Sequence, residues 1–345
     1  MSFVARLDAF QRRHAVLGYP LGVIYKFFDD QGNYLAMTIT YNAFVAVFPL
    51  LLISSSVLGF VLQDNVDLQQ TILNSAVGEF PIIGTQLSTP QGMRGSFGAV
   101  LAGSLVALYG VLGLGQAVQN AVNVGWSVPR NSRRNPFKSR LWSALLLSLA
   151  GMVVLGLALL TNFSGSLMGQ LPELTQGIEW LVQGASLAVT VAGLTLLLRW
   201  AGPTRSPWRQ TVPGAAFIVL VWIAVQRFGG LYVDRVLARV DDVSAVFALS
   251  LGLIGLIYVA ANALVLGVEI NVVLAESLFP RALLTPFTDQ VDLTDADRRA
   301  YTRYAQAQRH KGFELVEVDF TADATDTSAD SGGSTTSLTG DQKVT

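Results

Sequence analysis

Polar side chains recur at helical spacing inside a long apolar segment, residues 95–129. Tyr109, Gln116, Asn120 and Asn123 fall within a stripe about 60° wide when successive residues are set 100° apart. These groups donate and accept hydrogen bonds, but they include no activated nucleophile and no general base. The stripe therefore indicates binding of a polar group, not covalent catalysis.

Two other apolar segments carry similar polar faces. Tyr258, Asn262 and Glu269 share a face about 40° wide, and Tyr41 belongs to a polar face near the start of the first segment. A polar face in lipid must look at protein or water, so we expect a substrate cavity. Hydrogen bonds between neighbouring helices are the alternative, and both interpretations stay open. The predicted cavity residues are Tyr41, Tyr109, Gln116, Asn120, Asn123, Tyr258, Asn262 and Glu269.

Glu269 is the only carboxylate that lies inside one of these apolar segments. It lies near the end of the segment that begins at residue 243, about 36 Å along a helix axis from its start. Three roles stay open: an interfacial carboxylate at the headgroup layer, a salt-bridge or cap partner for a basic residue, and a titrating or substrate-contacting group.

Six apolar runs must position these side chains. Residues 31–63, 95–129, 141–172, 180–198, 210–226 and 243–268 contain no Asp, Glu, Lys or Arg. About 20 apolar residues cross a bilayer as a helix. The chain is also only 14% charged, below the usual value of about 25% for soluble domains. We predict an all-α, polytopic membrane protein with a bundle of six transmembrane helices.

Basic residues alternate between the connecting segments. They cluster in the N-terminal 34 residues, in the loop 128–140 and after residue 198, whereas residues 64–94 hold only Arg94 and residues 163–178 hold none. Lys and Arg favour the cytoplasmic side. The alternation predicts a multi-pass protein of a bacterial cytoplasmic membrane with both termini in the cytoplasm.

The segments outside the bundle have distinct compositions. We divide the chain into an N-terminal cytoplasmic amphipathic segment (1–34), the six-helix domain (35–279), a cytoplasmic C-terminal segment (280–320) and a disordered acidic tail (321–345). The first segment is predicted to lie in the membrane interface, or to pack against the ends of the bundle. Gly18-Tyr19-Pro20 is expected to break its helix in two.

Several chemistries lack the residues they require. The chain has no Cys, and His14 and His310 stand apart from any acidic cluster, so we expect no metal, no cofactor and no enzymatic activity. No phosphate-binding GxxxxGK[ST] loop is present. The basic residues are expected to contact anionic lipid at the cytoplasmic face and not nucleic acid. The predicted headgroup contacts are Arg130, Arg133, Arg134, Lys138, Arg140 and Arg227.

Four short motifs follow one another in an order that resembles the YihY/BrkB family of bacterial inner-membrane proteins. They are Thr40-Tyr41 with Pro49-Leu50, Ala121-Val-Asn123-Val-Gly-Trp126, Pro213-Gly214-Ala215 with Phe228 and Tyr232, and Leu266-Gly267-Val-Glu269-Ile270. The resemblance covers residues 19 to 280. It implies a six-helix bundle with both ends cytoplasmic and an N-terminal interfacial helix.

These observations favour a transporter that does not use ATP, or a lipid-translocating protein, with a polar intramembrane cavity. A structural or scaffold protein of the envelope is the alternative. The ribonuclease activity once ascribed to the resembling family is disfavoured, because the chain offers no metal ligands. Membrane lipids are the expected partners, while a homo-oligomer and further protein partners stay open.

Overall fold

The computed structural model describes residues 3–61, 97–135, 137–145, 147–149, 151, 175–202, 207–235, 242–288 and 291–320. Over these ranges the chain is helical and forms no β-strand, which confirms the all-α prediction for this part. The long helices are α3 (Gly32–Val61), α6 (Phe97–Gly125), α8 (Thr175–Ala201), α9 (Trp208–Arg235) and α10 (Asp242–Ala275). The shorter elements are α1 (Phe3–Arg13), α2 (Ala15–Asp29), the 3-10 turn η1 (Arg130–Ser132) and α11 (Asp295–Ala307).

Three of the described helices contain segments long and apolar enough to cross a membrane. They are Gln183–Ala201 in α8, Trp208–Gly229 in α9 and Ser250–Ala275 in α10. α3 and α6 hold the first two apolar runs and are 30 and 29 residues long. Most of the third run, 141–172, and the tail 321–345 lie outside the described residues. The count of six spans and the disordered tail therefore stay predictions.

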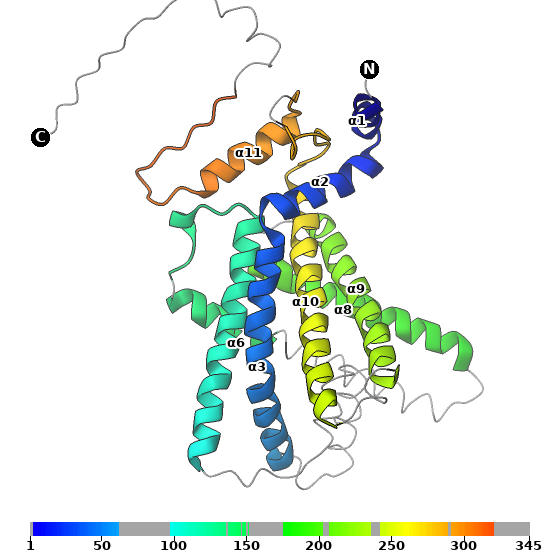
Figure 1. Ribbon diagram of the computed structural model, residues 1–345, viewed down its shortest axis with the longest axis vertical. Coiled ribbons are helices and arrows are strands. Elements are labelled where there is room, and N and C mark those ends of the chain that lie inside the picture. Colours follow the sequence, from blue (N-terminus) through cyan, green and yellow to red (C-terminus); the bar gives the residue numbers. More distant parts are fainter. Residues whose placement is uncertain are drawn as a thin grey trace, which may run out of the picture.

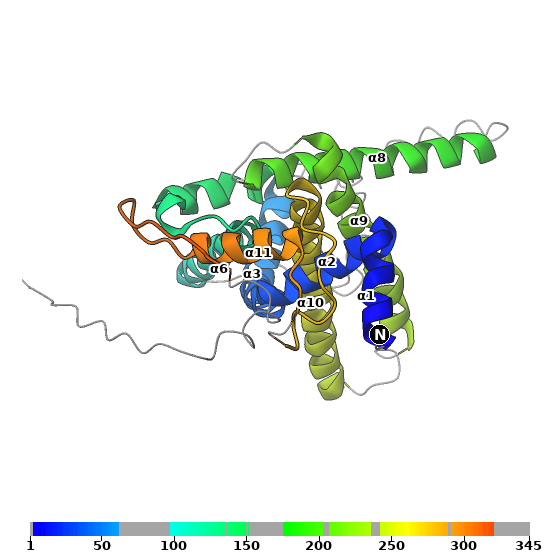
Figure 2. The same cartoon turned by 90° about the horizontal axis from the view of Figure 1, so that it is seen from above.

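α3, α6 and α10 lie side by side, and α9 packs along the other side of α10 (Figure 1). Small residues allow close approach: Gly110 of α6 faces the backbone of Ala46 in α3, and Gly113 packs against Asn42. α8 packs on α9, and its N-terminal part extends away from the other helices (Figure 2).

One end of the helices is covered by α2, α11 and the segments 276–288 and 291–294 between α10 and α11 (Figure 1). We call it the capped end. A core of buried apolar residues joins α2, α6, α8, α9, α10 and α11 there, and it includes Val23, Val122, Leu198, Ala215 and Val272. Since these residues lie at the ends of the long helices, the cap is continuous with the bundle.

The helical break in the N-terminal segment lies at His14, so the break predicted at Gly18-Tyr19-Pro20 was wrong. Pro20 is inside α2, and His14 is extended, with φ −117° and ψ 98°. A side chain at Gly18 would press on Pro280, and one at Gly22 would meet the carbonyl of Leu278 at 3.0 Å. Both glycines therefore allow α2 to pack closely against the cap.

Candidate functional site

Lys26 of α2 reaches Glu269 of α10 at the capped end. Both side chains are buried, with 1% and 0% of their residue surface exposed. The Nζ atom of Lys26 lies 3.5 Å from Oε2 of Glu269 and donates a short hydrogen bond to Asp30, one turn along α2. We call Lys26, Asp30 and Glu269 the inner cluster. In it, two carboxylates share one ammonium group.

Neighbouring helices close the inner cluster on its other sides. Tyr304 of α11 places its ring centre 5.2 Å from Nζ of Lys26. Gly125 brings the α6 backbone so near that a methyl group there would lie 3.2 Å from Oε1 of Glu269. Lys26 itself is carried on a face with Val23 and Phe27, which belong to the buried apolar clusters. Burial of the charge thus follows from packing of its apolar neighbours.

Burial and nearby charges act in opposite directions on Lys26. Burial alone would lower its pKa, but the carboxylates of Glu269 and Asp30 outweigh burial, and the pKa is raised above 10.5. Burial raises the pKa of Tyr304, and the negative charges of Asp30, Asp29 and Glu269 raise it further. Lys26 is therefore charged and Tyr304 neutral at physiological pH.

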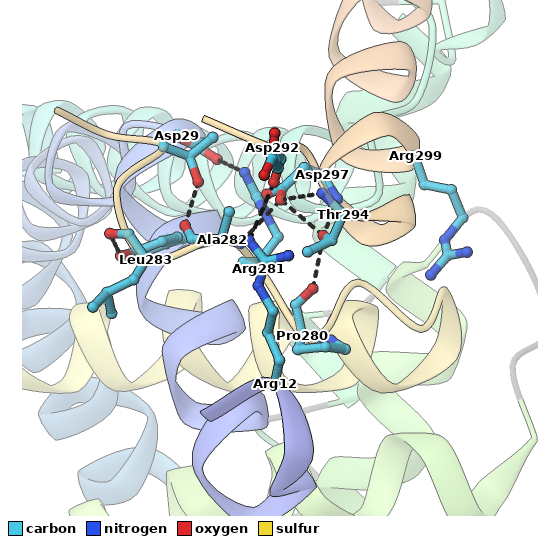
Figure 3. Close-up of polar contacts among 12 residues, drawn as sticks. Arg12, Asp29, Pro280, Arg281, Ala282, Leu283, Asp292, Thr294, Asp297 and Arg299 are labelled. Atoms are coloured by element: carbon cyan, nitrogen blue, oxygen red, sulfur yellow. Dashed lines mark hydrogen bonds and ion pairs between the residues drawn. The ribbon is translucent and has the colours of Figure 1, made fainter. Parts of the chain in front are cut away.

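Arg281 forms the centre of a second charge group, which we call the outer cluster, with the buried Asp297 and the partly exposed Asp29 (Figure 3). Its Nη2 atom lies 3.2 Å from Asp29, and its Nε donates to Oδ1 of Asp297. Burial would lower the pKa of Arg281, but its hydrogen bond and charge interaction with Asp297 raise it. Since Asp29 and Asp30 are adjacent, α2 connects the two clusters.

Asp297 has donors for both of its oxygens. Oδ2 accepts hydrogen bonds from the backbone nitrogens of Ala282 and Thr294, both at 3.0 Å, and from the Thr294 hydroxyl at 2.8 Å. Thr294 and Asp297 also form the capping box that begins α11. Figure 3 shows these contacts converging on one carboxylate. The arrangement fixes the start of α11 against the cap.

Glu269 has far fewer hydrogen-bond donors than Asp297. Its ion-pair partner is Lys26 at 3.5 Å, which is long for a hydrogen bond. Within the described part of the chain, both of its oxygens are buried without a hydrogen bond. A buried carboxylate in this state is costly, and an ionisable group on a membrane helix is a functional candidate by default.

The predicted cavity residues occupy different environments. Tyr41 and Tyr109 are 67% and 74% exposed, and Asn120 is exposed and accepts a hydrogen bond from Arg133 at 3.2 Å. Asn262 donates to the backbone oxygen of Tyr258 on its own helix. Gln116, Asn123, Tyr258 and Asn262 are half-buried. Glu269 is the fully buried member of the eight, and the structure brings it together with Lys26, not with the other seven.

Three of the six predicted headgroup contacts, Arg130, Arg133 and Arg134, lie in the segment that follows α6. Arg130 approaches His310 at 3.3 Å, and the Arg134 guanidinium stacks over Trp142 at 4.4 Å. Lys138 and Arg140 are exposed. Arg227 is exposed on α9, about 28 Å along the helix from Trp208 and so far from the capped end. Lipid contact by these residues stays a prediction.

Sequence reasoning missed the partners of Glu269 and the whole outer cluster. Lys26 is an isolated charge among apolar residues, and this was a usable signal. Thr294 and Asp297 also match the capping-box pattern, which predicts a helix start. Of the three roles left open for Glu269, the salt bridge now has a named partner.

Among the described residues, no group of three or more His, Asp or Glu side chains is placed to hold a metal ion.

Comparison with known proteins agrees with a membrane protein. The family model described as "Virulence factor BrkB" matches residues 23–287. The chain belongs to the BrkB family. A UPF0761 membrane protein of Psychrobacter sp. (strain PRwf-1) is 24% identical over 294 residues, which are 83% of this chain and 53% of that protein.

Two further relatives match shorter stretches. A UPF0761 membrane protein of Paraburkholderia xenovorans (strain LB400) is 30% identical over 34% of this chain and 28% of its own length. An uncharacterized protein of Dickeya dadantii (strain 3937) is 29% identical over 53% of this chain and 61% of its own length. The chain thus spans less than two thirds of each relative, and their names indicate no catalytic activity. No solved structure matches the chain.

Proposed function

We propose that this BrkB-family membrane protein is a non-ATP-driven transporter or lipid-translocating protein whose capped end is controlled by the Lys26–Glu269 ion pair. The observation that carries the proposal is Glu269, which is fully buried on a spanning helix and poorly hydrogen-bonded. Groups of this kind mark ion and substrate pathways in membrane proteins. Its partner Lys26 comes from α2, a helix of the cap.

The inner cluster has the connectivity of a gate. Asp30 is the C-cap residue of α2, the helix that carries Lys26, so their contact survives a movement of α2 as a body. The contact between Lys26 and Glu269 joins two helices, and it is lost in such a movement. Protonation of Glu269 removes its attraction for Lys26 and leaves that ammonium group with Asp30. A proton on Glu269 would therefore favour release of α2 from α10.

The polar stripes supply the substrate path in this proposal. Tyr41, Tyr109 and Asn120 are exposed on the outer faces of α3 and α6. Polar side chains on an outer face suit a lipid headgroup that moves along the boundary between protein and bilayer. Their exposure supports the lipid-translocating form over a transporter with an enclosed solute pathway.

The direct test is translocation of a fluorescent phospholipid in proteoliposomes. The wild type is expected to exceed protein-free vesicles, and Glu269→Gln to abolish the excess. The matched control is Glu276→Gln. Glu276 follows directly after α10, and its partly exposed carboxylate pairs with Arg303 of α11. The double variant Asn120→Leu/Asn262→Leu is expected to lose flux as well. Equal flux in wild type and Glu269→Gln would refute the gate, and no wild-type flux would refute lipid translocation.

A scaffold role is the second candidate, and the exposed apolar surface of the N-terminal helices favours it. Leu7 and Phe10 of α1 and Val16 of α2 are exposed large apolar side chains. In that case the double variant Leu7→Glu/Phe10→Glu is expected to lose protein partners in cross-linking experiments, while the polar stripes tolerate apolar replacement. Retention of every partner by that variant would remove the support for a scaffold.

A further inference from the structure

A small cavity lies at the capped end between α6, α8, α9 and α10. Its volume is about 10 Å³, which suffices for one water-sized group. Asn271, on its wall, is two residues from Glu269 and so on a different face of α10. The lining residues are Val122, Trp126, Leu198, Arg199, Thr211, Val268 and Asn271.

We propose that this cavity is a phosphate-binding site, in which one phosphate oxygen enters and the rest of the group stays beside Arg199. The site is separate from the inner cluster and does not depend on transport. A membrane lipid headgroup and free phosphate present the same chemistry, and the apolar lining favours the lipid.

Asn271 presents a free donor to the cavity. Its Oδ1 accepts a hydrogen bond from the backbone nitrogen of Gly214 at 2.9 Å, so its orientation is fixed and its Nδ2 is left over. Any side chain at Gly214 would collide with Asn271 and with the carbonyl of Gly267. Among the described residues, Nδ2 donates no hydrogen bond, although Asn271 is only 3% exposed. This amide group is therefore available to donate to an acceptor in the cavity.

Arg199 supplies the charge for an anion. It lies in the last turn of α8, and its guanidinium stacks over the Trp208 ring with 4.7 Å between its central carbon and the ring centre. In the described structure it forms no ion pair. A guanidinium held in place without a carboxylate is suited to a phosphate.

The remaining lining fits the same ligand. Thr211 is buried, and its hydroxyl makes a long contact of 3.4 Å to the Pro207 carbonyl, so it can turn to a closer acceptor. None of the described residues that line the cavity is a carboxylate. Its polar groups are therefore mainly donors, and its other walls are apolar. This combination selects an anion and places apolar surface next to it, as a phospholipid requires.

The test is equilibrium binding of a short-chain fluorescent phosphatidic acid to the purified full chain in detergent, measured by anisotropy. Arg199→Gln is expected to weaken binding about tenfold or more, because it removes the charged donors. Arg209→Gln, at an exposed position on α9 near the same end, is the matched control and is expected to bind normally. A diacylglycerol probe without phosphate is expected not to bind.

Competition separates the two sources of phosphate. Displacement of the probe by inorganic phosphate indicates a site open to the free ion, and displacement by unlabelled phosphatidic acid alone indicates a lipid site; both support the proposal. Thr211→Val is the second variant, with an expected loss of a few-fold, and it serves if Arg199→Gln does not fold. Absence of binding, or equal binding by the wild type and the folded variant, would overturn the site. Equal losses in Arg199→Gln and Arg209→Gln would also overturn it.

Discussion

Asp297 and Glu269 are both carboxylates without exposed surface, but their surroundings differ sharply. Asp297 receives a guanidinium, two backbone N–H groups and a hydroxyl. Glu269 has one ammonium group at 3.5 Å, which it shares with Asp30. A buried carboxylate whose oxygens all accept hydrogen bonds stabilises one conformation. A buried carboxylate that lacks hydrogen-bond donors destabilises that conformation and can be stabilised by a change to another one. The comparison favours a structural role for the outer cluster and is consistent with the gate proposed for the inner cluster.

The largest effect on stability is expected for Asp297→Asn. It leaves Arg281 buried with only the partly exposed Asp29, and a guanidinium cannot lose its charge. We expect a loss of about 3–5 kcal/mol, as for other broken buried pairs. Thermal unfolding in detergent and protease cleavage of residues 276–294 measure it, with the exposed Asp295→Asn as control. An unchanged unfolding temperature would contradict the structural role.

A smaller effect is expected for Lys26→Met. This change leaves Asp30 and Glu269 together without a cation, but carboxylates can take up protons, unlike Arg281. We expect a loss of about 2–3 kcal/mol at neutral pH that diminishes toward acid pH. Adding Glu269→Gln should restore part of the lost stability. The thermal unfolding midpoints of the single and double variants at pH 5 and pH 8 provide the check, and equal losses at both pH values would contradict the shared-charge arrangement.

Glu269→Gln alone is expected to change stability by about 1 kcal/mol or less, because Lys26 keeps Asp30 and Gln has nearly the same shape. Flux should nevertheless be lost, as proposed above. Unfolding curves and translocation assays on the same preparation separate the two properties. A loss of stability as large as that of Asp297→Asn would show that Glu269 is also a structural carboxylate.

The smallest effect is expected on the stability that the ion pairs of Lys26 contribute at high pH. The pKa of Lys26 is raised above its ordinary value of 10.5, so its ion pairs contribute fully below pH 10.5 and are lost as pH rises through the raised pKa. The difference in stability between wild type and Lys26→Met should therefore shrink above pH 10.5. The difference between wild type and Asp297→Asn should persist, since Arg281 remains charged. If the stability differences for Lys26→Met and Asp297→Asn changed with pH in the same way, the inner and outer clusters could not be distinguished by the titration of Lys26.

Much of the fold follows from the sequence alone. Long runs without charge predict helices, and five of the six runs lie in α3, α6, α8, α9 and α10; most of the third run, 141–172, is outside the described residues. A run of apolar residues satisfies its backbone only as a helix in lipid, so no partner needs to be known. Periodicity also identified Glu269 as an ionisable group on a polar face. The resemblance to the family could also be found from the sequence, because its motifs are short and local.

The tertiary structure decided which charges meet. Lys26 and Glu269 come from segments far apart in the chain, as do Asp29 and Arg281. Helical periodicity fixes the face of a residue, but the partner on that face depends on how the helices cross. The break at His14 shows the same limit: Gly18 and Pro20 were predicted to break the helix, and only the structure shows that Gly18 lies inside α2, against Pro280 of the cap. Composition and spacing thus determined a helical membrane protein with a carboxylate near a helix end, and only packing decided that this carboxylate is buried against Lys26.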